Sequence, residues 1–363
     1  MNEPVTLSFV GDILFGEPLE SYKNGVRTFV SKHGVDPFEF CRPMFQGSSH
    51  VVGNLECVVT DISNKTGLLR EILRAPKSFA EVLQRGGITI VNLANNHTLD
   101  HGAEALRDTI ENLRRCGIQS FGYREDGSVQ EQPLVVSEHC VDLGFLGYNL
   151  ANMDDARLNE AVEKALTAAP KAKEKVDVLI VSLHWGREYT NMTAPSLVRM
   201  GKRFLDTGCD VLYGHHSHRQ QGVLMLNRKL VAPSLGNFVF DDIRSANRLN
   251  SILRLKVDSR GVVDYDVIPC YLNDRYQPVP TETCRGEIDR LTRELSEMMD
   301  CRAETGAQIE EDIARQVNRE HLKNRIRIRY RLLRYWYNYI AHAHTLVHWK
   351  LIRRQRVFSV TDS

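Results

Sequence analysis

The sequence has no Cys-x-x-Cys pair, no long apolar run and no basic start followed by an apolar stretch. With no such cysteine pair, the eight cysteines are interpreted as buried, reduced thiols. No segment approaches the roughly 20 apolar residues that are needed to cross a bilayer. Because the N-terminal residues also lack the pattern of a signal peptide, we expect a cytoplasmic protein.

Positive and negative charges nearly balance, because the 47 Lys and Arg residues exceed the 46 Asp and Glu residues by one, which gives a net charge of +1. The charge of the whole molecule therefore predicts neither nucleic acid nor a membrane as partner. Hydrophobic residues make up 42% and charged residues 26%, the balance of a globular protein. The 363 residues fit one large domain and an additional segment, and a change of pattern predicts a domain over 1–284 and an extension over 285–363.

Strands and helices alternate through the first two-thirds of the chain. Thr6–Val10, Ile88–Leu93 and Val176–Leu183 are apolar and rich in β-branched residues, which is typical of strands. Gly102–Cys116 and Pro195–Asp206 are predicted helices. The alternation predicts a layered α/β fold with helices packed outside a sheet, and ligands in such folds bind beyond the strand ends.

Polar side chains follow several of these strands, and each alone has an ordinary structural explanation. Asp12, Asn54 and Glu56 fit turns, and Asn96 fits a helix N-cap. His184 alone fits a hydrogen-bonded core histidine. Together they supply carboxylate, amide and imidazole donors at the ends of separate strands. This combination predicts a metal site formed by Asp12, Glu56, Asn96, His184, His216 and His218.

Three histidines occur within four residues, at positions 215, 216 and 218. The spacing of His216 and His218 on an extended loop lets one side chain reach each of two neighbouring metals, with Ser217 pointing away. Imidazole combined with carboxylate and amide oxygen suits Mn, Zn or Fe better than Mg or Ca alone. The predicted cofactor is therefore one or two such divalent ions.

Seven stretches resemble the CapA-type poly-γ-glutamate capsule synthesis proteins, a branch of the calcineurin-like metallophosphoesterase superfamily. In chain order, over roughly residues 5–270, they are LSFVGDILFG, VVGNLECVVTD, LRAP, VNLANNHTLDHG, SLHWGREY, YGHHSH and PSLGNFVFD. The resemblance implies a four-layered α/β/β/α sandwich with a dimetal centre at the strand ends. The positions that match the superfamily's metal ligands are Asp12, Glu56, Asn96, His184, His216 and His218.

The resemblance also implies roles beyond the ligands. His97 matches the histidine that faces the substrate, and Asp100 is the nearest carboxylate that could orient it. Arg74 and Arg187 are candidates to hold an anionic substrate, because a guanidinium grips a carboxylate or phosphate in two places. Ordinary surface or structural ion pairs explain both arginines equally well. Asn237 is a further candidate to line the substrate site.

The sequence departs from the phosphoesterase pattern at the first strand, where Asp12-Ile13-Leu14 replaces Asp-x-His. One metal therefore loses a ligand, and Glu56 is one methylene longer than the aspartate it replaces.

The ligand set and the resemblance leave two main hypotheses. The first is a metal-dependent hydrolase that uses a metal to lower the pKa of its water and cleaves a phosphoester or a γ-glutamyl or peptide-like bond. Such an enzyme would be linked to poly-γ-glutamate, with an anionic polymer or peptide-like substrate. The alternative, which the missing ligand favours, is a non-catalytic metal-binding scaffold in a polymer synthesis or export complex. A true phosphoesterase is a third interpretation.

The C-terminal segment is basic: residues 315–356 contain many Lys and Arg and a single acid, Glu320. Its apolar residues recur at steps of three and four, which predicts an amphipathic helix. They are Leu322, Ile326, Tyr330, Leu333, Tyr337 and Ile340. This helix fits three roles: packing on the core, lying on an anionic membrane as a peripheral anchor, or docking an acidic polymer or protein partner. No motif predicts specific nucleic-acid binding.

Overall fold

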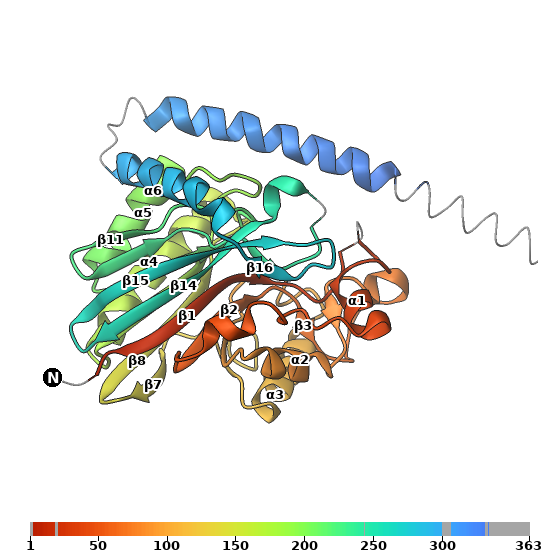
Figure 1. Ribbon diagram of the computed structural model, residues 1–363, viewed down its shortest axis with the longest axis horizontal. Helices are drawn as coiled ribbons and strands as arrows, with labels where there is room; N and C mark the ends of the chain where they lie inside the picture. The colour runs from red at the N-terminus through yellow and green to blue at the C-terminus, as the bar shows by residue number, and fades with distance from the viewer. Residues whose placement is uncertain (1–2, 19–20, 243, 300–305, 331–332, 334–363) are drawn as a thin grey trace, which may run out of the picture. The chain divides into compact units, whose positions relative to one another are not determined.

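The computed structural model describes residues 3–18, 21–242, 244–299, 306–330 and 333. Within these residues, two large β-sheets form the centre of the molecule, one of eight strands and one of six (Figure 1). A small two-stranded sheet pairs β3 (Val58–Val59) with β4 (Arg74–Ala75). Both strands lie in the chain between β2 (His50–Leu55) and α2 (Phe79–Gly86).

The larger sheet is mixed and is built around β1, which pairs in parallel with β2 and β13 and antiparallel with β14. The order of its main path is β16-β15-β14-β1-β2-β5-β6. Its strands are β1 (Val5–Ile13), β2 (His50–Leu55), β5 (Ile90–Asn92), β6 (Gln119–Phe121), β13 (Asn237–Val239), β14 (Leu249–Asp258), β15 (Gly261–Leu272) and β16 (Pro278–Pro280).

The smaller sheet has the order β11-β12-β10-β9-β8-β7, with β8, β9, β10 and β12 parallel and an antiparallel strand at each edge. Parallel strands place their carboxyl ends along one edge of the sheet, which is where polar ligands can gather. The strands are β7 (Leu134–Glu138), β8 (Val141–Asn149), β9 (Val178–His184), β10 (Val211–His215), β11 (Leu224–Leu226) and β12 (Lys229–Ala232).

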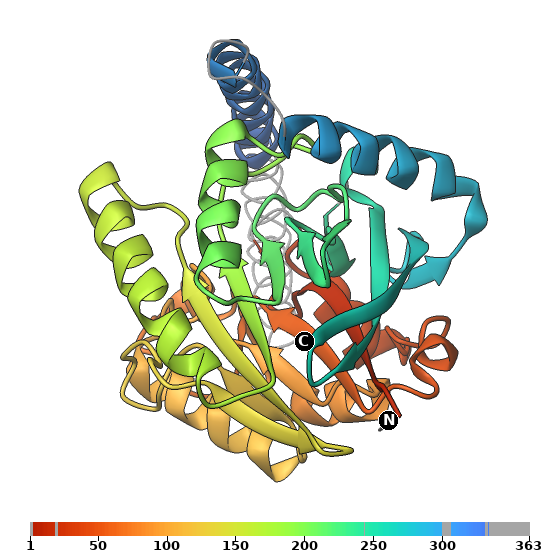
Figure 2. The same cartoon turned by 90° about the vertical axis from the view of Figure 1, so that its left-hand side faces the viewer.

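The two sheets pack face to face, because one buried apolar cluster draws Phe9 from β1 and Phe145 and Tyr213 from the smaller sheet. A second cluster joins the outer face of the larger sheet to α1 (Val26–His33), α2 (Phe79–Gly86) and α3 (Ala103–Arg115). A third joins the outer face of the smaller sheet to α4 (Asp155–Lys173) and α5 (Pro195–Asp206). Figure 2 shows the sheets between these two groups of helices. The predicted four-layered α/β/β/α sandwich is therefore confirmed.

Strand β9 illustrates why the sequence forms these layers. Its residues are all buried, with Val178 and Ile180 in the cluster between the sheets and Leu179 and Val181 in the cluster under the helices. A strand with both faces covered needs a continuous apolar run rather than alternation. This run is the pattern that predicted the strand.

The C-terminal part of the described chain is helical, as predicted. Helix α6 (Arg285–Met299) buries Ile288, Leu291 and Leu295. Residues 306–330 form a further helix, in which Ile313 and Val317 join a small cluster with Ala194. The first compact unit runs to Val317, because both helices bury side chains in it. The division after residue 284 stays a prediction.

Three further expectations concern the chain as a whole. The described cysteines are free of disulfide bonding, as expected, but the expected burial is wrong for Cys140, which is exposed, and for Cys116 and Cys284, which are half-buried. None of the described helices combines the length and hydropathy required to span a membrane. The expected amphipathic positions Tyr337 and Ile340 lie outside the described residues.

Candidate metal centre at the strand ends

Neighbouring strands deliver the predicted ligands to one place. In the larger sheet Asp12 pairs in register with Asn54 of β2, and Glu56 follows directly after that strand. In the smaller sheet His184 ends β9 opposite His215, which ends β10. Since the two sheets pack face to face, the polar ends of their strands converge at one edge of the sandwich.

A close backbone approach fixes Asp12. Its amide donates a hydrogen bond of 2.9 Å to the carbonyl of Gly236, so the loop before β13 closes against β1. A side chain at Gly11 would place its Cβ 1.9 Å from that carbonyl oxygen. Glycine at this position therefore lets the two segments meet and leaves the Asp12 carboxylate buried beside the histidine loop.

The histidine loop departs from ordinary backbone geometry. His216 and His218 have φ values of 83° and 55°, in the left-handed region that residues with a Cβ seldom occupy. Such conformations cost about 1–3 kcal/mol each and cluster at functional sites. In this loop they turn both imidazoles toward the strand ends, where they are 2% and 6% exposed.

Glu56 lies among three imidazoles. Its Oε1 is 3.8 Å from Nε2 of His184, 3.8 Å from Nε2 of His218 and 3.9 Å from Nε2 of His97. These distances are too long for hydrogen bonds. Two ligand atoms that each lie about 2.0–2.2 Å from the same metal ion can stand this far apart.

Several buried polar atoms of the site have no hydrogen-bond partner among the described residues. Most buried polar atoms in native proteins are paired, so a group of unpaired ones in one place needs an explanation. These atoms are Asp12 Oδ2, Glu56 Oε1 and Oε2, Asn96 Oδ1, His184 Nε2 and His216 Nδ1. All are oxygen or imidazole nitrogen donors, and together they fit a divalent cation of the Mn, Zn or Fe type.

The charges of the site are balanced by protons. Burial alone raises the pKa of Asp12, but the imidazoles of His215 and His218 outweigh it and hold that pKa well below its usual range. Burial raises the pKa of Glu56 well above its usual range. Although burial lowers the pKa of His218, the carboxylates of Glu56 and Asp12 raise it to about 10. A metal can replace these protons, because metal ligands must be deprotonated.

His184 and His216 differ from His218, because burial lowers their pKa values and keeps both imidazoles neutral. Burial, followed by the neighbouring His216, lowers the pKa of His184 well below its usual range. Burial lowers the pKa of His216 to about 4. The two rings lie 4.8 Å apart between centroids, and neutral imidazole is the form that binds metals.

A network of asparagines supports the carboxylate, and sequence reasoning gave it no role. Asn54 Nδ2 donates to Asp12 Oδ1 at 2.9 Å, and its Oδ1 accepts from Asn92 at 3.1 Å and Asn95 at 3.3 Å. His215, which the predicted ligand set leaves out, places Nδ1 2.9 Å from Asp12 Oδ1. The repeated asparagines in NLE and NLANN were the available signal.

His97 and Asp100 form a pair at the exposed side of the site. The Nδ1 of His97 lies 2.9 Å from Asp100 Oδ2, and its Nε2 points toward Glu56. Burial opposes ionisation of Asp100, but the hydrogen bond and charge of His97 lower its pKa overall. The His97 side chain is 28% exposed, so it faces both the ligand cluster and solvent.

The three predicted substrate-binding residues lie in different surroundings. Asn237 belongs to the cluster, where its Oδ1 is 3.0 Å from His218 Nδ1. Arg187 is exposed. The guanidinium of Arg74 is buried, and its hydrogen bonds go to the carbonyls of Arg70 and Thr60 and to the carboxylate of Glu71. Substrate binding by these residues stays a prediction.

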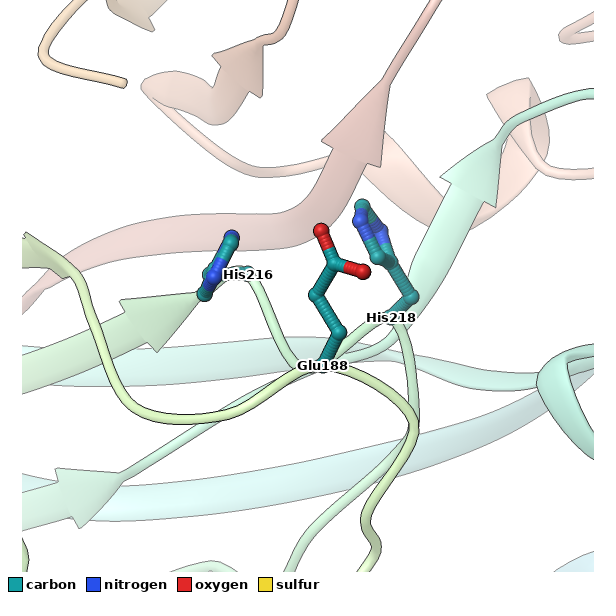
Figure 3. Close-up of side chains that lie close together, drawn as sticks. All are labelled: Glu188, His216 and His218. Atoms are coloured by element: carbon teal, nitrogen blue, oxygen red, sulfur yellow. The ribbon is translucent and has the colours of Figure 1, made fainter. Parts of the chain in front are cut away.

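Glu188 is an acidic residue of the site that sequence reasoning missed, although it lies in the HWGREY stretch. Figure 3 shows its carboxylate between the imidazoles of His216 and His218. One donor atom from each of the three lies within 4.8 Å of the others, and the same holds for Asp12, Glu56 and His218. We call Asp12, Glu56 and His218 the inner group, and Glu188, His216 and His218 the outer group.

The fold and the site define a class: an α/β/β/α sandwich with a candidate metal centre at its strand ends. Residues 6–242 match the family model described as bacterial capsule synthesis protein PGA_cap. The chain belongs to this family. The predicted resemblance to the CapA-type proteins is therefore confirmed.

Individual relatives agree with the family. The chain is similar to the capsule biosynthesis protein CapA of Bacillus anthracis, at 28% identity with coverage of 81% of this chain and 74% of that protein. It is 26% identical to the PGA biosynthesis protein CapA of Bacillus subtilis, covering 81% and 78%. Among solved structures, a hypothetical protein from Thermus thermophilus matches at 14% identity and a TM-score of 0.44, covering 73% of this chain and 98% of that one.

Proposed function

We propose that this protein is a metal-dependent hydrolase that acts on a phosphoester or a γ-glutamyl or peptide-like bond and is linked to poly-γ-glutamate. The observation that carries the proposal is the group of buried, unpartnered donors around Glu56. The polymer link rests on similarity to the two CapA proteins. The residues that would hold the metal are Asp12, Glu56, Asn96, His184, His216 and His218.

A divalent ion held there would lower the pKa of a bound water and polarise the bond to be cleaved. The remaining chemistry belongs to the chain. Asp100 holds the imidazole of His97 through Nδ1, and Nε2 lies 3.2 Å from Asn96 Nδ2 at the edge of the ligand cluster. Once protonated at both nitrogens, the ring could give the Nε2 proton to a leaving group. The asparagine network keeps Asp12 in place before any ion binds.

The test is metal analysis of the purified protein, followed by assays with Mn, Zn or Fe. The substrates are bis-p-nitrophenyl phosphate, p-nitrophenyl phosphate, a γ-glutamyl anilide and poly-γ-glutamate. The expected result is bound metal and turnover of at least one substrate that EDTA abolishes. A His184→Ala/His216→Ala double variant should lose both.

The outcomes separate the main hypotheses. Absence of metal in the wild type, or unchanged turnover in the double variant, would contradict the proposal. Bound metal without turnover of any substrate would instead support the non-catalytic scaffold. The first strand is consistent with a reduced ligand set, because Leu14 packs in the apolar cluster under the helices and supplies no donor.

A further inference from the structure

The helix over residues 306–330 is anchored near its start by apolar packing (Figure 1). Ile313 and Val317 are buried, and both belong to a small cluster with Ala194. Residues four positions apart lie on the same side of an α-helix, so these two side chains define one buried face. That face already has its partner.

A second set of apolar side chains follows along the same segment, and it is exposed. Leu322, Ile326 and Tyr330 are 59%, 60% and 67% exposed, and Leu333 is 70% exposed. Their spacing of four, four and three places them on one side of a helix, and we call these four residues the apolar stripe. A continuous exposed row of large apolar side chains marks an interaction surface.

The apolar stripe lies on the opposite side of the helix from the buried face. An α-helix turns by about 100° per residue, so the nine positions from Ile313 to Leu322 amount to about two and a half turns. Ile326 stands in the same relation to Val317. The stripe is therefore not a continuation of the face that packs with Ala194, and that packing leaves it for another partner.

Basic side chains border the apolar stripe on both sides. Relative to Ile326, Arg325 and Arg329 are rotated about the helix axis by about 100° and 60° in one direction. Lys323 and Arg327 are rotated by about 60° and 100° in the other direction. All four basic residues are exposed. The helix consequently presents an apolar band between two rows of positive charge.

This positive charge is not neutralised along the helix. Glu320 is the sole acid among the described residues from 318 onward, and its carboxylate lies 2.8 Å from Nζ of Lys323. Arg325, Arg327 and Arg329 have no acid within four residues in either direction, so they form no ion pair along the helix. The surface is therefore complementary to a partner that combines negative charge with an apolar interior.

We infer that the apolar stripe and its basic borders bind an anionic lipid surface. A helix with this pattern lies in the plane of the membrane interface, with its apolar side chains among the acyl chains and its basic side chains at the headgroups. The ring of Tyr330 suits the same depth, because it is apolar with a polar tip. The inference involves none of the residues of the metal centre and does not depend on the proposed function.

Other partners would satisfy only part of this surface. A neutral membrane would cover the apolar stripe but gain nothing from the basic borders. A soluble acidic polymer would pair with the basic side chains but leave the apolar stripe in water. A second copy of the helix would bring its own basic borders toward these, and like charges repel each other. An anionic lipid surface satisfies both features at once.

The test is vesicle flotation of the full chain with phosphatidylcholine alone and with added phosphatidylglycerol. Binding should need phosphatidylglycerol and should weaken in salt, because ions screen the attraction. A Leu322→Glu/Ile326→Glu variant should bind at least about 10-fold less, from the loss of two buried side chains. The matched control is Leu69→Glu/Val135→Glu, which adds the same charge at two exposed apolar residues elsewhere and should bind as wild type does.

A second pair of variants separates charge from apolar contact. Arg325→Gln/Arg329→Gln should weaken binding to anionic vesicles at least about 10-fold, because each basic residue near the surface adds to the attraction. Arg114→Gln/Arg115→Gln removes the same charge from largely exposed positions of α3 and should bind as wild type does. Thermal unfolding checks that all four variants fold.

Loss of flotation in the stripe and border variants alone supports the inference. No flotation with anionic vesicles, equal flotation with neutral ones, or unchanged binding by the Leu322→Glu/Ile326→Glu variant overturns it. Sedimentation without lipid and binding to poly-γ-glutamate address the other partners. If that variant loses self-association or polymer binding while wild type ignores anionic vesicles, the apolar stripe serves one of those partners and the inference is overturned.

Discussion

The inner and outer groups of the strand-end site use the same chemistry in different surroundings. The carboxylates of Asp12 and Glu56 are fully buried, while Glu188 is partly exposed. The inner carboxylates come from two neighbouring strands of one sheet, whereas the outer group comes entirely from loops after strands of the other. The register of β1 and β2 therefore positions the inner carboxylates, whereas hydrogen bonds of the loops after β9 and β10 position the outer group.

The largest expected effect comes from removing the inner charge. Asp12→Asn keeps the shape of the side chain but removes the carboxylate that the histidines surround. The affinity for Mn²⁺ at the inner position, which the inner group forms, should fall about 100-fold or more, since even orienting residues cost 10–100-fold. Calorimetry measures this loss. Asp264→Asn, at a largely exposed aspartate, is the control, and equal affinities of the two variants would refute the inner assignment.

A substitution at His97 tests whether this residue acts as a general acid or as a metal ligand. His97→Gln should lower kcat about 100-fold, because a general acid contributes 10²–10⁴-fold, while metal content changes little. Asp100→Asn, which removes only the partner of Nδ1, should have a smaller effect of the same kind. Turnover assays on metal-loaded protein provide the measurement. Loss of metal from the His97→Gln variant would instead make His97 a ligand.

The pH dependence of metal binding should differ between the two groups. His218 has a pKa of about 10 and holds a proton near neutrality, so filling the inner position releases that proton and its affinity rises as pH rises. His216, with a pKa of about 4, has no proton to release. Calorimetry of Mn²⁺ binding in buffers of different ionisation enthalpy counts the protons. Mn²⁺ binding without proton release would contradict this account.

The smallest effects are expected at the two arginines. Arg74→Met should lower the free energy of unfolding by about 1–3 kcal/mol, because buried carbonyl groups lose their donors. Arg187→Ala, at an exposed position, should change it by less than about 0.5 kcal/mol. Denaturant titration measures both. If Arg187 holds substrate, its removal raises KM without changing stability; a changed stability with unchanged KM would make Arg187 structural.

Much of the fold and the inner site could be predicted because local patterns coincide with them. The helix predicted over Pro195–Asp206 is α5 with the same bounds, and the apolar run before His184 is β9. The inner ligands lie at or shortly after strand ends: Asp12 is the last residue but one of β1, Glu56 directly follows β2, and His218 lies three residues after β10. The general rule that parallel strands end at one edge was therefore enough to group them.

The remaining features depend on contacts that periodicity does not encode. Backbone hydrogen bonds of its loop position Glu188 at the site, and the guanidinium of Arg74 donates hydrogen bonds to the carbonyls of Thr60 and Arg70. Neither contact has a sequence signature. The compact unit likewise extends to Val317, because a helix beyond residue 305 buries Ile313 against a distant loop.

The account depends most on whether the buried donors surround a cation. Anomalous diffraction from crystals soaked in Mn²⁺ addresses this directly. We predict a peak bounded by the carboxylates of Asp12 and Glu56 and the imidazoles of His184 and His218. No peak there in fully soaked crystals, or Mn²⁺ bound only elsewhere, would contradict the claim that these strand ends form a metal centre.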